Sequence, residues 1–107
     1  MEYKRGFENV EPEEFSRLMR EQHILIDVRY EEEHEDESIL NAINIPLNQL
    51  ADFIETLRVQ SKDKAVLVYG STGGRSAAAC DMLYRAGYKY IYNLLGGIKA
   101  WKRVYGV

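Results

Sequence analysis

Residues 65–76 read AVLVYGSTGGRS and decide the fold. The first five are apolar and rich in β-branched side chains, which is typical of a buried strand in a parallel sheet. Three glycines within five positions, Gly70, Gly73 and Gly74, follow the strand, and helical spacing begins near Arg75. A strand that passes through a glycine-rich turn into a helix indicates an α/β fold, with a ligand site outside the carboxyl ends of the strands.

The same alternation of strands and helices extends on both sides of this unit. Further strands are expected at residues 24–28, 42–45 and 90–94, and helices after Pro12, around residues 50–57, over about 76–86 and after Gly97. This order predicts a mainly parallel central sheet flanked by helices, with right-handed crossovers. Because no repeat or linker interrupts the pattern, residues 1–107 are expected to form a single domain.

The composition is that of an ordinary globular protein, with 46% apolar and 29% charged residues. Cys80 is the only cysteine, so an internal disulfide is impossible and a reducing compartment is expected. The longest apolar run, residues 65–69, is far too short to cross a bilayer, and the first residues do not resemble a secretory signal. We therefore expect a cytoplasmic protein that does not bind membranes.

The charges are mixed, with 14 basic and 17 acidic residues. This balance gives no electrostatic reason to expect nucleic acid binding. Acidic side chains are concentrated in residues 31–37, which we interpret as a solvated surface segment. His34 lies within this segment, but no second ligand stands at a fixed spacing from it, so neither a metal site nor a cofactor is predicted.

The glycine-rich turn has the features of an anion-binding loop. Glycine allows left-handed backbone conformations that turn several N–H groups inward, and the following helix adds the positive end of its dipole. The guanidinium of Arg75 is a planar, permanently charged partner for oxyanions. A nucleotide-binding P-loop is not indicated, because only three residues separate Gly70 from Gly74 and arginine replaces its lysine. The predicted loop consists of Gly70, Ser71, Thr72, Gly73, Gly74, Arg75 and Ser76.

Four segments in this order resemble the single-domain rhodaneses, the thiosulfate sulfurtransferase family. They are residues 26–29 (IDVR), 42–46 (AINIP), 68–76 (VYGSTGGRS) and 95–101 (LGGIKAW). The resemblance covers about residues 11–105 and implies the three-layer rhodanese fold. It also implies that Asp27 and Arg29 lie beside the loop and brace it. A local salt bridge at the end of a strand explains the same pair equally well.

The sequence departs from the family at the position that matters most for chemistry. The resemblance implies a cysteine directly after the strand, where it carries sulfur as a persulfide, but this chain has Gly70. Asn41 likewise stands where the family has glycine. The six residues from Gly70 to Arg75 match the length of the sulfurtransferase loop, whereas related phosphatases have one residue more. The resemblance therefore implies a loop for a sulfur-sized group or a small anion such as sulfate or thiosulfate.

No other residue is a convincing nucleophile. Cys80 shares a helical stripe with other packed positions and is expected to be a buried structural thiol. The hydroxyls of Ser71 and Thr72 would need a general base. His23 precedes its strand, at the end opposite the loop, whereas His34 follows that strand and is the one histidine expected near the loop.

Three hypotheses remain open from the sequence. The first is a rhodanese-like domain without sulfurtransferase activity, whose loop binds a small anion or an unidentified protein partner. The second is an active sulfurtransferase in which Gly70 replaces the natural cysteine. The third is a different enzyme that uses Arg75, the loop amides and His34.

Overall fold

The computed structural model describes residues 6–61 and 63–107. Within them, five strands form one sheet in the order β1-β5-β4-β2-β3, and every pair of neighbours is parallel. The strands are β1 (Glu8–Val10), β2 (His23–Asp27), β3 (Ile43–Asn44), β4 (Ala65–Tyr69) and β5 (Ile91–Leu94). The predicted parallel α/β fold is confirmed, with β4 at the centre of the sheet.

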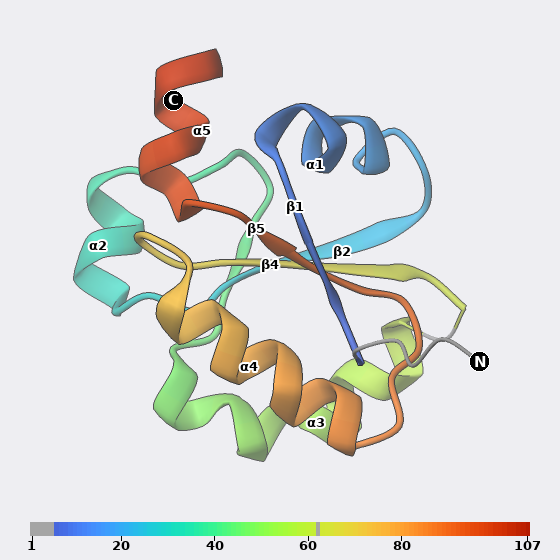
Figure 1. Ribbon diagram of the computed structural model, residues 1–107. Coiled ribbons are helices and arrows are strands. Elements are labelled where there is room, and N and C mark those ends of the chain that lie inside the picture. The colour runs from blue at the N-terminus through green and yellow to red at the C-terminus, as the bar shows by residue number, and fades with distance from the viewer. Residues whose placement is uncertain (1–5, 62) are drawn as a thin grey trace.

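Helices cover both faces of this sheet (Figure 1). They are α1 (Pro12–Leu18), α2 (Glu31–Asp36), α3 (Leu50–Ser61), α4 (Gly74–Arg85) and α5 (Gly97–Tyr105), with a 3₁₀ turn, η1, at Leu47–Gln49. Figure 1 shows α1 and α5 on one face, α3 and α4 on the other, and α2 beside the turn between β4 and α4. The fold therefore has three layers, as the sequence predicts.

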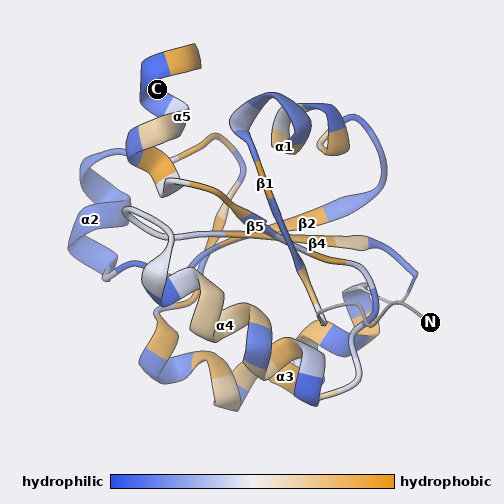
Figure 2. Ribbon diagram, viewed as in Figure 1, coloured by the Kyte–Doolittle hydropathy of each residue, from blue (hydrophilic) through white to orange (hydrophobic). Residues whose placement is uncertain are grey.

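The alternation of side chains along β4 explains why both faces are covered. Val66 and Val68 pack into the core beneath α3 and α4, whereas Leu67 and Tyr69 pack into the core beneath α1 and α5. Figure 2 shows the resulting hydrophobic band along the central strands. A strand that is apolar on both sides must be covered twice, which places its carboxyl end, and the loop that follows, between the two helical layers.

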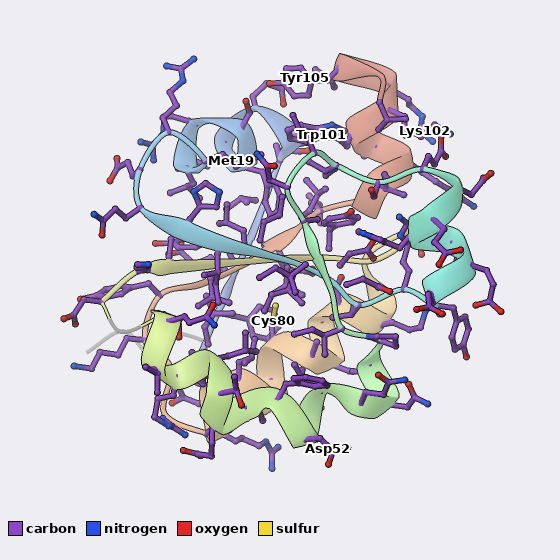
Figure 3. The ribbon with its side chains drawn as sticks, turned by 180° about the vertical axis from the view of Figure 1, so that it is seen from behind. Met19, Asp52, Cys80, Trp101, Lys102 and Tyr105 are labelled. Carbon is purple, nitrogen blue, oxygen red and sulfur yellow. The ribbon has the colours of Figure 1, made fainter. Side chains whose placement is uncertain are left out.

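Cys80 and Trp101 belong to these two different cores (Figure 3). The ring of Trp101 packs edge-on against Phe15, with centroids 6.1 Å apart. The side chain of Cys80 is fully buried beneath the sheet, and this burial raises the pKa of its thiol to about 12. The prediction that Cys80 is a buried structural thiol is confirmed.

Two elements differ from the sequence prediction. Strand β1 was not expected, because ENV has no apolar run; it forms by pairing with β5 at the edge of the sheet. Helix α2 was not expected either. It spans Glu31–Asp36, is favoured by the acidic residues in its first turn and has no buried residue, so the interpretation of residues 31–37 as a solvated surface segment is confirmed. Glu33 contacts the glycine-rich turn, and Glu37, which directly follows the helix, contacts Lys102 (2.5 Å).

The remaining element boundaries shift by a few residues. The strand expected at residues 42–45 is reduced to Ile43–Asn44, and that expected at 24–28 runs instead from His23 to Asp27. Asn41, which stands where the resemblance implies glycine, has a left-handed φ of 71°. Asparagine tolerates this conformation better than most residues, so a left-handed turn forms here without glycine. None of the described helices is long and apolar enough to span a membrane.

Candidate functional site

The glycine-rich loop lies at the carboxyl ends of β2 and β4, where α/β sheets bind ligands. The residues of the loop differ in how far they are exposed to solvent. Gly70 and Ser76 are buried, whereas Thr72 and Gly74 are exposed and the others are partly buried. His23 begins β2 and therefore lies at the opposite edge of the sheet, as expected.

Gly70 lies against the first turn of α4. A Cβ atom built at Gly70 would lie 3.5 Å from the backbone nitrogen of Ser76 and 3.6 Å from its side-chain atoms. These are ordinary van der Waals distances, and no strained backbone angle opposes a side chain there. The position of Gly70 therefore accommodates a small side chain directed toward the amino end of α4.

The amino end of α4 supplies the hydrogen-bond donors of the loop. Helix α4 begins after Gly73, whose φ of 114° lies outside the range of most L-residues, and its first intrahelical bond runs from Ala77 N to Gly73 O (3.1 Å). The N–H groups of Gly74, Arg75 and Ser76 precede that bond, and no side chain of the described residues caps this helix. Together with the helix dipole, they favour a negatively charged ligand.

Helix α5 holds the other side of the loop. The N–H groups of Ile98 and Lys99 donate to the carbonyls of Gly70 and Ser71, at 2.9 and 3.2 Å. This approach requires Gly97, because a Cβ atom at Gly97 would lie 2.4 Å from the carbonyl atoms of Ser71. The loop carbonyls are thus bound by α5, which fixes the loop against the neighbouring helix.

Substituting alanine for Gly97 is therefore expected to destabilise the fold by about 2–4 kcal/mol. The methyl group would overlap Ser71, and the φ of 62° is itself unfavourable for alanine. Urea denaturation of Gly97→Ala measures this loss in the free energy of unfolding. Gly74→Ala is a matched control, since a Cβ atom there has no neighbour within 4 Å. Equal stability of the two variants would contradict the described approach of α5 to the loop.

Glu33 is a member of the site that the sequence analysis missed. The hydroxyl of Ser71 donates to Glu33 Oε2 at 3.1 Å, and Nη2 of Arg75 lies 3.6 Å from Glu33 Oε1. The backbone N–H of Tyr30 also donates to this carboxylate (2.9 Å). Partial burial acts to raise the pKa of Glu33, but these two hydrogen bonds and the charge of Arg75 outweigh it, so the pKa is lowered.

Asp27 is the centre of a buried network beneath the loop. Its carboxylate accepts hydrogen bonds from the backbone and guanidinium of Arg29 (2.8–3.2 Å) and from the hydroxyl of Tyr69 (3.0 Å), and lies 2.9 Å from Nδ1 of His34. Arg29 also donates to the carbonyl of Glu37 (2.7 Å). Burial acts to raise the pKa of Asp27, but the hydrogen bonds outweigh it and the pKa is lowered.

These contacts decide what Asp27 and Arg29 do directly. They form a buried salt bridge, and in the described part of the chain neither side chain hydrogen-bonds to residues 70–76. Any bracing of the loop is therefore indirect, through Tyr69, which immediately precedes Gly70, and through the end of α2. His34 contacts Asp27 and lines a hollow with Met19 and Trp101, and no described hydrogen bond joins it to the loop.

Two surface hollows lie at opposite edges of the sheet. One of about 220 Å³ adjoins the loop and is lined by Glu33, Ser71 and Lys99, among others. Another of about 360 Å³ lies at the opposite edge of the sheet, between Arg58 and Tyr88. The position of the loop at the carboxyl ends of the strands, rather than cavity size, identifies the first as the functional candidate. Among residues 6–61 and 63–107, no group of His, Cys, Asp and Glu is arranged to hold a metal ion.

Comparison with known proteins agrees with this topology. The sequence model of the rhodanese-like domain matches residues 11–104. The chain belongs to the rhodanese-like family. This rhodanese-like domain is 34% identical over 79 residues to the thiosulfate sulfurtransferase GlpE of Coxiella burnetii, covering 74% of this chain and 71% of the relative. It is 39% identical over 74 residues to the thiosulfate sulfurtransferase PspE of Escherichia coli, covering 69% of each.

Solved structures confirm the rhodanese-like fold. A rhodanese-related protein from Thermoplasma volcanium superposes with a TM-score of 0.76 at 28% identity, covering 92% of this chain and 94% of the other. The family and fold inferred from the four sequence segments are thus confirmed.

Proposed function

We propose that this rhodanese-like domain binds a small anion, such as sulfate or thiosulfate, in the loop of residues 70–76 and lacks sulfurtransferase activity. The observation that carries the proposal is the first turn of α4, where three N–H groups precede the first intrahelical bond and the backbone nitrogen of Ser76 lies 3.5 Å from a Cβ atom built at Gly70. Relatives named thiosulfate sulfurtransferases support an anion of this kind.

The chemistry of the loop favours binding over sulfur transfer. Transfer requires a thiolate that attacks the donor sulfur, and glycine offers none. We propose that Gly70 occupies the position of the nucleophile in the sulfurtransferases. Cys80 cannot replace it, because its buried thiol stays protonated at neutral pH. The base named in the third hypothesis, His34, is engaged by Asp27 and has no described hydrogen bond to the loop, whereas Ser71 donates its hydroxyl to Glu33, a carboxylate whose lowered pKa makes it a weak base.

Calorimetric titration with thiosulfate tests this function. Arg75 is half-exposed, so its charge-assisted contact with the anion is expected to contribute about tenfold in affinity. Arg75→Ala should therefore weaken binding by about this factor. Arg85→Ala is the matched control, because Arg85 lies at the other end of α4 and pairs with Asp81. Equal affinities of the chain and Arg75→Ala, or no binding by either, would contradict the proposal.

Two of the earlier expectations remain predictions. A protein partner that presents an anionic group to the loop would use the same donors, and a cytoplasmic location rests on the single cysteine.

The hypothesis that Gly70 replaces a natural cysteine requires the same loop geometry, and the unmodified sequence of the source would distinguish it.

A further inference from the structure

We propose that Glu33 sets the anion affinity of the loop, by competing with the anion for Arg75 and Ser71. This inference rests on the proposed function, since it concerns the regulation of the same site. It gives α2, a surface helix in which no residue is buried, a role in anion binding.

The contacts of Glu33 place its carboxylate where it engages the loop's own donors. One oxygen accepts from the hydroxyl of Ser71 (3.1 Å), and the other lies 3.6 Å from Arg75. Arg75 is also within 3.4 Å of the Ser71 hydroxyl, so the three groups form one cluster. An anion that takes up Arg75 and Ser71 must therefore displace the carboxylate or bind beside it.

The carboxylate is held in this position by two features of the chain. The backbone N–H of Tyr30 donates to Glu33 Oε1 at the start of α2, and the guanidinium carbon of Arg75 lies 5.1 Å from the centre of the Tyr30 ring. Arg75 is thus contacted by an aromatic ring and a carboxylate from the same turn. Glu33 is therefore a fixed negative charge beside the loop, which opposes a dianion more strongly than a monoanion.

Several other charged groups lie on the same surface, so a test of Glu33 must control for the effect of a neighbouring charge. Arg29 contributes its charge from the end of β2, and the hollow beside Ser71 is also lined by acids from the end of α2 and lysines from α5, namely Asp36, Glu37, Lys99 and Lys102. Of these, Glu37 is paired with Lys102, and Arg29 with Asp27. Glu33 is the acid that contacts loop side chains directly.

The experiment compares Glu33→Gln with the unmodified chain in calorimetric titrations with thiosulfate at constant ionic strength. Glutamine removes the charge and keeps one acceptor oxygen for the N–H of Tyr30, while its amide nitrogen can donate to the Ser71 hydroxyl, so affinity should rise about five- to tenfold. Glu32→Gln removes a neighbouring charge from an exposed side chain without described partners and is the control, expected to change affinity less than twofold. Circular dichroism verifies that both variants are folded.

A second measurement needs no substitution. Because the ionised form of Glu33 weakens anion binding, a bound anion must in turn raise the pKa of Glu33. The coupling free energy between the two events is the same in both directions. Carboxyl NMR titration with and without saturating sulfate measures this pKa, which should rise when sulfate binds. The pKa of Glu55, whose carboxylate pairs with Arg58 on α3, should not change and is the control.

The outcomes separate this inference from the proposed function. If the unmodified chain binds thiosulfate through Arg75 but Glu33→Gln binds equally well and the pKa of Glu33 is constant, the role of Glu33 is overturned and the anion site stands. Binding by Glu33→Gln alone would support the role of Glu33 but contradict the proposed function of the unmodified chain. If neither protein binds the anion, both proposals are wrong.

Discussion

Replacing Gly70 with cysteine is expected to convert this chain into a working sulfurtransferase. The structure accommodates the new Cβ atom at 3.5–3.6 Å from Ser76, next to the amino end of α4. The N–H groups and dipole of that helix end, together with Arg75, lower the pKa of a thiol placed there and favour its thiolate. The thiolate would take the outer sulfur of thiosulfate and release sulfite, and cyanide would then remove that sulfur as thiocyanate and regenerate the thiolate.

Thiocyanate formation from thiosulfate and cyanide measures this gain. The unmodified chain should be indistinguishable from the uncatalysed reaction, whereas Gly70→Cys should exceed it by at least about a thousandfold, as expected when a nucleophile is restored to an otherwise complete site. Gly70→Ser fills the same space without a thiol and should remain inactive. An inactive Gly70→Cys that is folded and still binds thiosulfate would contradict the geometry described for the loop, and turnover by the unmodified chain would contradict the proposed function.

Replacing Asp27 with asparagine is expected to cause the largest loss of stability in this domain. Asp27 and Arg29 are both almost completely buried, and asparagine leaves the guanidinium of Arg29 without a charged partner. Such a loss costs about 3–5 kcal/mol, a large share of the roughly 5–15 kcal/mol that stabilises a domain. Urea denaturation should therefore show Asp27→Asn much less stable than the chain. Glu14→Gln, which breaks an exposed ion pair with Arg17, is the control and should change little.

The same substitution has a defined pH dependence. The pKa of Asp27 is lowered in the folded state from its ordinary 3.8, so its contribution to stability is present above that value and is lost as the pH falls through the lower folded pKa. The stability difference between the chain and Asp27→Asn should thus be constant near neutral pH and shrink below about pH 4. A difference that does not change down to pH 3 would contradict the lowered pKa.

The sheet was largely predictable because its central strands are long apolar runs. Residues 65–69 are apolar on both faces, and this pattern requires a buried strand with helices on either side. Strand β1 carries no such signal, since Glu8 and Asn9 are exposed and only Val10 packs inward. An edge strand of three residues forms through its pairing with β5, which the sequence of residues 8–10 alone does not encode.

The candidate site was predicted in part for a similar reason. The glycines and Arg75 of the loop are local signals, and the structure brings them together as a turn and a helix start. Glu33 contacts Ser71, 38 positions away in sequence, and lies on a short helix in which no residue is buried, so no apolar pattern marked it. The one available signal was the acidic first turn after Tyr30, in which Glu33 returns to the Tyr30 N–H in the manner of a capping box.

Backbone amide NMR during a thiosulfate titration tests the central claim, an anion site built from the start of α4, most directly. The account predicts saturable shifts of the amides of residues 71–76 in the unmodified chain, with smaller changes at Ile98 and Lys99, whose N–H groups contact the loop carbonyls. Shifts confined instead to the cavity at the opposite edge, around Arg58 and Tyr88, would contradict it, as would a spectrum that thiosulfate leaves unchanged.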